Sequence, residues 1–309
     1  MNSSFSQKLP SFQLAWDSTS LGELKRCPRA YQLAIVEGWR SQEENVHLMF
    51  GIALHEGREW YARRRAVGES HDMAVESVVD MILRKTWDNE LSRPAFVGDE
   101  KKNRFTLIRA LVWLLDHWEN DPLETLLFDD GRPMVEVSFR FPWGESASGE
   151  QLLLCGHLDR VGEINGQTWI ADTKTTYKSL DEGSSQYFFW QFSPDNQVSL
   201  YTFAGQVVLA KQCAGVLIDA VQIAVGFSRF VRAPITRTKA QIAEWLEGTR
   251  IAFRQAEEYA LCAFWPMNEK ACFSCAFRKV CSLPPAARQA ELEKNYMRRV
   301  WDPLQIRGE

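Results

Sequence analysis

The sequence lacks any apolar run that approaches 18 residues, so we expect no membrane span. The segment Met1 to Pro10 is polar and lacks the apolar stretch and small-residue cleavage site of a secretory signal. Internal repeats and low-complexity segments are also missing from the sequence. We therefore expect a cytoplasmic protein, in a reducing compartment where cysteines rarely pair as disulfides.

The sequence also lacks an excess of positive charge. Its net charge of −4 argues against a protein that binds nucleic acid through a generic basic tail. It does not exclude a nuclease, because a carboxylate-rich metal site lowers the net charge and basic residues need to line only one groove. There is no Gly-x4-Gly-Lys-Ser/Thr phosphate loop, so we do not expect ATP hydrolysis.

The composition of the 309 residues, 45% hydrophobic and 25% charged, is that of a soluble globular protein. Apolar spacing predicts a helix over 45–65 and a helical insert within 71–129. Ser20 to Glu23 fits a capping box that would open an N-terminal helix. These features predict helices before the first strand.

The pattern then changes to alternation with a period of two. Strands are predicted over 134–141, 151–164, 167–176, 215–225 and 227–233. Helices are predicted from Ser193-Pro194 to about 211, with proline at the first helical position, and over 239–262. The order predicts a mixed α/β fold, with a mixed β-sheet core flanked by helices.

The dipeptide Asn165-Gly166 is a strong signal for a two-residue hairpin. If Ile164 pairs with Gln167 and no bulge intervenes, Asp159 lies directly opposite Asp172 on the same face of the sheet. Two carboxylates so close destabilise a sheet unless something offsets their charge. A divalent cation such as Mg²⁺ or Mn²⁺ would do so.

Lys174 shares the face of Asp172 because it lies two residues further along the strand. An ammonium beside a metal ligand can orient water or stabilise charge on a phosphate, while the metal activates water and polarises the phosphate. These are the requirements of phosphodiester hydrolysis. The alternative is an Asp–Lys ion pair on the surface of a hairpin.

Two helices carry further candidates. His55 is a candidate metal ligand, although a single helical histidine is more often structural. Gln197 and Tyr201 share one helical face and follow the proposed catalytic strand, where they could hold a phosphate or a water. Ordinary amphipathic packing would explain the same spacing.

Cys272, Cys275 and Cys281 form a C-x2-C-x5-C cluster, for which Cys27 is the best fourth ligand. Four thiolates suit either zinc or an iron–sulfur cluster, and the spacing does not decide between them. Cys155 and Cys213 are expected to be buried apolar residues.

Taken together, these motifs resemble the RecB-like branch of the PD-(D/E)XK nucleases that carry a four-cysteine iron–sulfur cluster. CRISPR-associated RecB-like exonucleases and the AddB nuclease domain are similar. The motifs are Ser20 to Tyr31, Gly51 to His55, Gly156 to Arg160, Asp172-x-Lys174, Gln197-x3-Tyr201 and the cysteine cluster. They cover about 20–281 of the chain.

The resemblance implies roles for these residues. His55, Asp159 and Asp172 would bind Mg²⁺ or Mn²⁺, Lys174 would be the catalytic lysine, and Gln197 and Tyr201 would be auxiliary residues of the site. Cys27, Cys272, Cys275 and Cys281 would hold a [4Fe–4S] cluster, with zinc as the lesser alternative. Glu136 falls where relatives often carry a glutamate, but we do not assign it a metal contact. Many members have glutamate where this chain has Asp172.

The resemblance also implies a restriction-endonuclease-like fold with one nuclease domain over 18–281. That domain would include a helical insert at about 66–130 and cluster-binding segments 20–31 and 262–282, followed by a tail over 283–309. The expected activity is an exonuclease on single-stranded or free-ended DNA. A structure-specific endonuclease, a non-catalytic DNA-binding or assembly subunit, and a zinc-binding interaction protein are the alternatives. The gene could belong to a phage or to a CRISPR or DNA repair operon. The resemblance leaves open whether the protein forms a homo-oligomer or binds a repair or CRISPR protein.

Candidate substrate contacts follow from the same implied activity. Arg160, Lys178, Arg229 and Arg232 could contact phosphates, and Trp190 or Phe189 could stack on bases. For each of them taken alone, a solvated charge or a core aromatic residue is the favoured interpretation.

Overall fold

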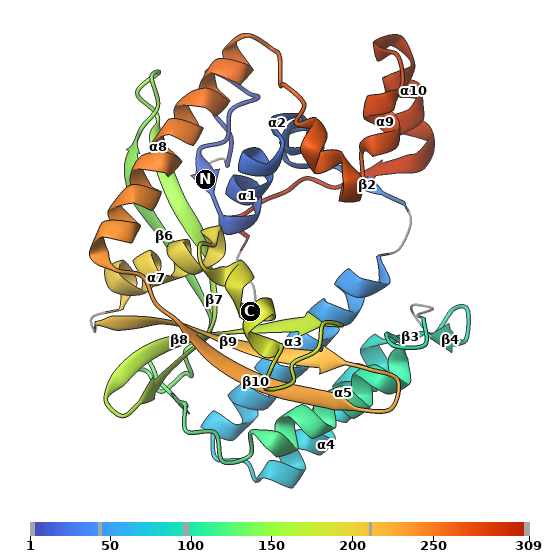
Figure 1. Ribbon diagram of the computed structural model, residues 1–309, viewed down its shortest axis with the longest axis vertical. Helices are drawn as coiled ribbons and strands as arrows, with labels where there is room; N and C mark the ends of the chain where they lie inside the picture. The colour runs from blue at the N-terminus through green and yellow to red at the C-terminus, as the bar shows by residue number, and fades with distance from the viewer. Residues whose placement is uncertain (1–3, 43–44, 95–98, 210–211, 306–309) are drawn as a thin grey trace. The chain divides into compact units, whose positions relative to one another are not determined.

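The computed structural model of the protein describes residues 4–42, 45–94, 99–209 and 212–305 (Figure 1). The chain forms two compact units. The first unit consists of Met1–Glu43, Ser138–His157 and Thr238–Glu309, and the second of Glu44–Val137 and Leu158–Arg237. The partition into one nuclease domain with an insert and a tail stays a prediction.

The second unit holds most of the sheet. Its elements are α3 (Val46–Ala66), α4 (His71–Lys85), β3 (Trp87–Asp88), β4 (Arg93–Pro94), α5 (Arg104–His117), β5 (Glu124–Thr125), β8 (Gln167–Thr176), α6 (Ser185–Phe189), the 3-10 turn η2 (Trp190–Phe192), α7 (Asn196–Val208), β9 (Cys213–Ile223) and β10 (Ser228–Ile235). Two long strands, β6 (Val135–Glu145) and β7 (Gln151–Ile164), contribute residues to both units.

The sheet of the second unit is mixed. The strands β7, β8, β9 and β10 are neighbours in this order, and β5 also pairs with β7. The β7–β8 and β9–β10 pairs are antiparallel, whereas β8 and β9 are parallel. The mixed α/β fold with a central sheet flanked by helices is therefore confirmed, and it is consistent with a restriction-endonuclease-like fold.

Strand β9 is buried along almost its whole length, as expected for a strand covered on both faces. On one face, Val221 and Ile223 join a core formed by α3, α4 and α5, which lie side by side in Figure 1. On the other face α7 lies against the sheet: a Cβ at Gly205 would come within 2.9 Å of Ile170. Successive residues of β8 therefore point alternately toward α7 and toward the layer of α3, α4 and α5.

The helical layer is fixed by its caps and by close packing. Asn45, Ser70 and Asn103 each accept a hydrogen bond from a backbone amide at the start of α3, α4 and α5. Gly57 lets α3 approach α5, because a Cβ there would lie 2.8 Å from Leu111. The layer holds α3 against the sheet.

The first unit has its own core. Its elements are β1 (Ala15–Trp16), α1 (Ser18–Arg26), α2 (Pro28–Tyr31), the π-helical turn η1 (Gln32–Val36), β2 (Trp39–Ser41), α8 (Lys239–Leu261), the 3-10 turn η3 (Glu269–Ser274), α9 (Arg278–Ser282), α10 (Pro285–Asn295) and β11 (Tyr296–Arg298). Trp16 stacks between Tyr31 and Phe253, with ring centroids 5.4 and 4.6 Å away. β1 pairs in parallel with Leu153 and Leu154 of β7.

Two predicted helix starts are wrong. The capping box of α1 consists of Asp17 and Ser20, not of Ser20 and Glu23, because the Asp17 carboxylate already accepts the amide of Ser20. Helix α7 begins at Asn196, since Asp195 caps it by accepting the amide of Val198. Strands β7 and β8 have the predicted bounds. In the described part of the chain, no helix is both long and apolar enough to cross a membrane.

Candidate active site

Three side chains from three elements of the second unit converge on one point. His55 of α3, Glu136 of β6 and Asp159 of β7 each place a ligand atom within 4.8 Å of the others. His55 Nε2 lies 2.5 Å from Glu136 Oε1, and His55 Nδ1 lies 3.4 Å from Asp159 Oδ2. Among the residues that the structure describes, this is the one group with donor atoms close enough to share a metal ion.

The hairpin brings Asp159 to Asp172 in the predicted register. Asn165 and Gly166 have φ of 50° and 76°, as a tight turn of this type requires. The ladder then runs without a bulge from Ile164–Gln167 to Arg160–Ala171. Asp159 and Asp172 are the residues that follow this last pair, and the charge of Asp159 contributes to raising the pKa of Asp172, so the two carboxyl groups lie close together. The predicted register of the hairpin is confirmed as far as Arg160–Ala171.

Lys174 is connected to every remaining predicted residue. Its Nζ lies 2.9 Å from Asp172 Oδ2 and donates a hydrogen bond to Gln197 Oε1 at 2.7 Å. Gln197 Nε2 in turn donates to the Tyr201 hydroxyl at 3.0 Å. Asp172 and Lys174 thus face α7 from β8, and one turn of α7 supplies both auxiliary side chains.

The charges of the site shift its protonation equilibria. Burial by itself lowers the pKa of His55, but the charge of Asp159 and the hydrogen bond that the ring donates to Glu136 outweigh it and raise that pKa to about 9. Burial raises the pKa of Asp172 to about 7; Lys174 opposes this shift and Asp159 adds to it. Burial also lowers the pKa of Lys174, but Asp172 and Asp159 together raise it. Protons held by His55 and Asp172 therefore offset part of the negative charge of the crowded carboxylates.

The residues present fit a divalent cation. Oδ2 of Asp159 is buried and accepts no hydrogen bond within the described residues. Glu136 is only 7% exposed, and Asp172 3%. Three carboxylates and one imidazole are an oxygen-rich donor set of the kind that suits Mg²⁺ or Mn²⁺.

Glu136 is the site residue to which the sequence analysis gave no role. Its backbone has a φ of 52°, a conformation that costs non-glycine residues about 1–3 kcal/mol and persists where the surroundings enforce it. A signal was present in the sequence: Glu136 is a charged residue between Val135 and Val137 in a strand. The structure brings Glu136, rather than Asp172, into the group of close donor atoms.

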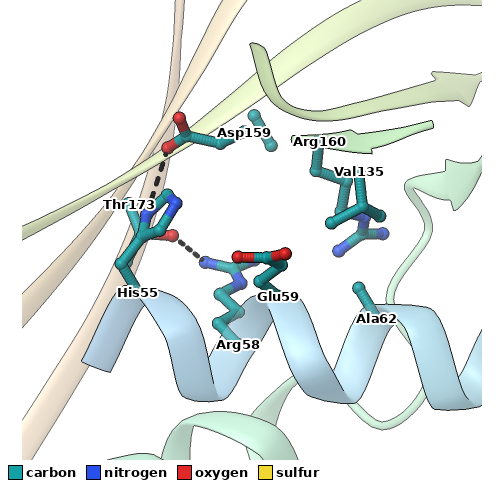
Figure 2. Close-up of a pocket in the computed structure, with 9 residues that line it drawn as sticks. His55, Arg58, Glu59, Ala62, Val135, Asp159, Arg160 and Thr173 are labelled. Carbon is teal, nitrogen blue, oxygen red and sulfur yellow. Dashed lines mark hydrogen bonds and ion pairs between the residues drawn. The ribbon is translucent and has the colours of Figure 1, made fainter. Parts of the chain in front are cut away.

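A small cavity of about 20 Å³ lies behind this group. Figure 2 shows that His55, Arg58 and Glu59 reach toward it from α3, opposite Asp159 and Thr173 of the strands. The cavity is large enough for about one water molecule. It is too small for a nucleotide, so substrate would have to approach the group from another side.

Arg160 and Arg232 are not phosphate contacts. Arg160 lies 2.9 Å from Asp121 Oδ2, and Arg232 lies 2.6 Å from Asp121 Oδ1 and 2.5 Å from Asp219 Oδ1. Arg58 completes this buried network through an ion pair with Asp219 and a 2.9 Å hydrogen bond to Thr173. Arg160 and Arg232 are therefore neither phosphate contacts nor solvated charges, because their guanidinium groups are already paired in the interior.

The other candidate contacts differ in exposure. Phe189 is 9% exposed and belongs to the core, whereas Trp190 is 62% exposed. Arg229 forms an ion pair with Asp181, and Lys178 is exposed. Trp190 and Lys178 therefore remain available to a substrate, and their roles stay predictions.

The four predicted cluster cysteines do not form a ligand set. Cys27 is buried and accepts the amide of Asn268 at 3.4 Å, while Cys272 Sγ lies 3.8 Å from the Asn268 carbonyl oxygen. Cys275 lies 3.9 Å from the guanidinium of Arg26. Each of these sulfurs has its own protein partner, and Cys281 joins them in no common group within the described residues. The structure thus supports neither the [4Fe–4S] cluster nor zinc. The expectation that Cys155 and Cys213 are buried is confirmed, at 1% and 4% exposure.

Known proteins were compared with the whole chain. No curated protein matches it. A solved structure named "Putative exonuclease" from Eubacterium rectale is 10% identical, with 92% of this chain and 94% of that chain covered and a TM-score of 0.48. The crystal structure of SSO0001 has 13% sequence identity and a TM-score of 0.31. Its match covers 77% of this chain and 95% of the SSO0001 chain. The model of the PD-(D/E)XK nuclease superfamily matches residues 16–282. The chain therefore belongs to the PD-(D/E)XK nuclease superfamily.

Proposed function

We propose that this protein is a metal-dependent deoxyribonuclease, and that it acts as an exonuclease on single-stranded or free-ended DNA. One observation carries the proposal: Glu136, Asp159 and the Asp172–Lys174 pair lie on neighbouring strands of one unit, and His55 of α3 reaches the first two. A buried excess of carboxylates beside an ammonium serves no evident packing purpose. It suits a site that holds a cation and an anionic substrate together.

His55, Glu136, Asp159 and Asp172 are the residues that would hold Mg²⁺ or Mn²⁺. When bound, such an ion lowers the pKa of a coordinated water and polarises the scissile phosphate. Asp172 would deprotonate on metal binding, because the charge of a cation would offset the burial and the repulsion by Asp159 that raise its pKa.

Lys174 would stabilise the negative charge that develops on the phosphate oxygens. Its raised pKa keeps the ammonium protonated at neutral pH. Gln197 holds the ammonium in place through the 2.7 Å hydrogen bond and is itself held by Tyr201. In the reaction, the oxygen of a water forms a bond to phosphorus, one P–O ester bond breaks, and a proton passes to the leaving oxygen.

Membership in the RecB-like branch is part of the same proposal. It is supported by His55 on α3, which precedes the long strands, and by Gln197 and Tyr201 on α7, which follows β8 and α6. An endonuclease and a non-catalytic DNA-binding subunit are the alternatives. The completeness of the connected site favours an enzyme, because a binding subunit would not need Lys174 held between Asp172 and Gln197.

The test is DNA cleavage by purified protein with Mn²⁺, Mg²⁺ or EDTA, on linear single-stranded, linear duplex and circular DNA. Lys174→Met and Asp159→Asn should each lower the rate by about 10³-fold or more while the protein stays folded. Exposed Asp80→Asn on α4 serves as the matched control. Degradation of linear DNA alone supports an exonuclease, and cutting of circular DNA supports the endonuclease. No metal-dependent cleavage of any substrate by folded wild-type protein would sink the enzyme proposal.

A further inference from the structure

Arg58 connects the helix that carries His55 to two central strands of the sheet. It is only 8% exposed. Its Nη1 donates a hydrogen bond of 2.9 Å to Thr173 Oγ1 of β8, and its Nη2 forms an ion pair with Asp219 of β9. All of these residues belong to the second unit.

The two partners of Arg58 lie at the same level of the sheet. Thr173 and Asp219 are register partners in the parallel ladder of β8 and β9. One planar guanidinium therefore spans both strands, and its rigid geometry accepts only a narrow range of positions. Phe50 and Leu54 of α3 pack in the apolar core, but such contacts have no preferred direction. Arg58 thus adds a directional contact that fixes where α3 lies over the strands.

Arg58 is not needed to balance the charge of the network to which it belongs. Asp121 and Asp219 already form ion pairs with Arg232, and Arg160 pairs with Asp121. These two arginines equal the two aspartates in number, and Arg58 adds a third buried cation. A third guanidinium costs desolvation energy, so neutrality of the network does not explain its presence.

Arg58 also lies next to the candidate metal ligand of α3. His55 precedes it by three residues, about 4.5 Å along the helix, so both side chains share one face. Figure 2 shows them reaching from α3 to the strands, Arg58 to Thr173 and His55 to Asp159. A shift of α3 relative to β8 would therefore move His55 away from Asp159.

The other end of the link lies within the proposed catalytic strand. Thr173 stands between Asp172 and Lys174, with its side chain on the opposite face of β8. Arg58 therefore holds the backbone of this segment from behind. Asp172 lies outside the group of close donor atoms to which His55 belongs. The separation of these two residues depends on how α3 is placed against β8.

We propose that Arg58 is a positioning residue of the candidate active site. Through Thr173, it sets the separation of His55 on α3 from Asp172 and Lys174 on β8. It does not itself contact the cation or the substrate, but keeps the donor atoms in the arrangement that binds a divalent cation. This inference rests on the proposed metal-dependent function and deepens it.

The test measures Mn²⁺ binding by isothermal titration calorimetry, together with urea unfolding. Arg58→Lys keeps a cation beside Asp219 but removes the planar fork, and Thr173→Val removes the acceptor with little change of shape. Each variant should bind Mn²⁺ about tenfold more weakly than wild type. The double variant should lose no more than either single variant, because both break the same link. Arg65→Lys, at an exposed position of the same helix, is the matched control and should bind Mn²⁺ as wild type does.

Three results would overturn the inference. In the first, both single variants unfold at lower urea concentrations but bind Mn²⁺ as tightly as wild type, which would limit Arg58 to a structural role. In the second, only Arg58→Lys weakens binding, which would show that Thr173 does not transmit the effect. In the third, the two losses add up in the double variant, so that the residues act independently. Wild-type protein that binds no Mn²⁺ would instead contradict the proposed function, and the inference would fall with it.

Discussion

Two buried clusters of charge lie within the second unit, and they are built on opposite principles. One is a network of three arginines and two aspartates: Arg58, Arg160, Arg232, Asp121 and Asp219. The other is the candidate active site, with three carboxylates, one imidazole and one ammonium: Glu136, Asp159, Asp172, His55 and Lys174. Thr173 connects them, because it accepts a hydrogen bond from Arg58 and lies between Asp172 and Lys174 on β8.

The pKa values of Asp121 and Asp172 show the difference between the two clusters. Burial by itself raises the pKa of Asp121, but Arg232 and Arg160 outweigh it and lower that pKa to about 2. Burial raises the pKa of Asp172 to about 7, and its single cation, Lys174, does not reverse the shift. The counter-charges therefore keep Asp121 ionised down to about pH 2, whereas the protonation of Asp172 changes near neutral pH. A cluster that supplies its own counter-charges stabilises the fold, whereas a cluster that lacks them is suited to bind a cation.

Of the variants that test this comparison, Asp219→Asn has the largest expected effect on stability. It would leave the guanidinium groups of Arg58 and Arg232 buried without enough negative charge, so we expect the free energy of unfolding to fall by about 3–5 kcal/mol. Urea unfolding at neutral pH measures it. Asp80→Asn, which removes an exposed ion pair with Arg84, should cost less than about 1 kcal/mol. Similar losses in the two variants would mean that the network contributes no more than a surface pair.

Asp121→Asn tests the same network through its pH dependence. The pKa of Asp121 is lower in the folded protein than its ordinary 3.8, so its carboxylate stabilises the fold above pH 4. We expect a loss of about 2–3 kcal/mol at pH 7. The difference between wild type and variant should shrink as the pH falls from about 4 to about 2, since both forms then carry a neutral group. Urea unfolding at a series of pH values that shows a constant difference would contradict this assignment.

Gln197→Ala acts on the other cluster, and its expected effect is on rate. Without Gln197, the ammonium of Lys174 loses its 2.7 Å acceptor and Tyr201 loses its donor. We expect kcat to fall about 10–100-fold with little change in KM, as for other residues that position a catalytic group. Gln206→Ala, at an exposed position of the same helix, should leave both constants unchanged. A rise in KM with an unchanged kcat would show that Gln197 binds substrate instead.

The candidate site was predictable where it depends on local chain geometry. Asn165-Gly166 sets the hairpin, the hairpin sets the register, and the register brings Asp159 opposite Asp172. The period of two then puts Lys174 on the same face, and the helical period puts Gln197 and Tyr201 on one face of α7. None of these steps needs knowledge of distant contacts.

The errors arose where a residue's role depends on partners far away in the sequence. In the sequence, Arg160 is a cation next to Asp159 with no partner nearby. In the structure it pairs with Asp121, which is 39 residues away. The four cysteines have metal-ligand spacing, yet their sulfurs form no common ligand group within the described residues. The spacing of cysteines along the sequence identifies candidate ligands. It does not show whether the fold brings their sulfurs together.

The sequence by itself therefore determined the mixed α/β class, the hairpin and the face on which Asp159, Asp172 and Lys174 lie, because these follow from backbone periods and one turn. Only the tertiary structure decided that Glu136 joins His55 and Asp159, and that Arg160 pairs with Asp121. Both depend on how helices and strands distant in sequence pack together. That packing sets which charges find partners inside the protein and which remain for a metal ion or a phosphate.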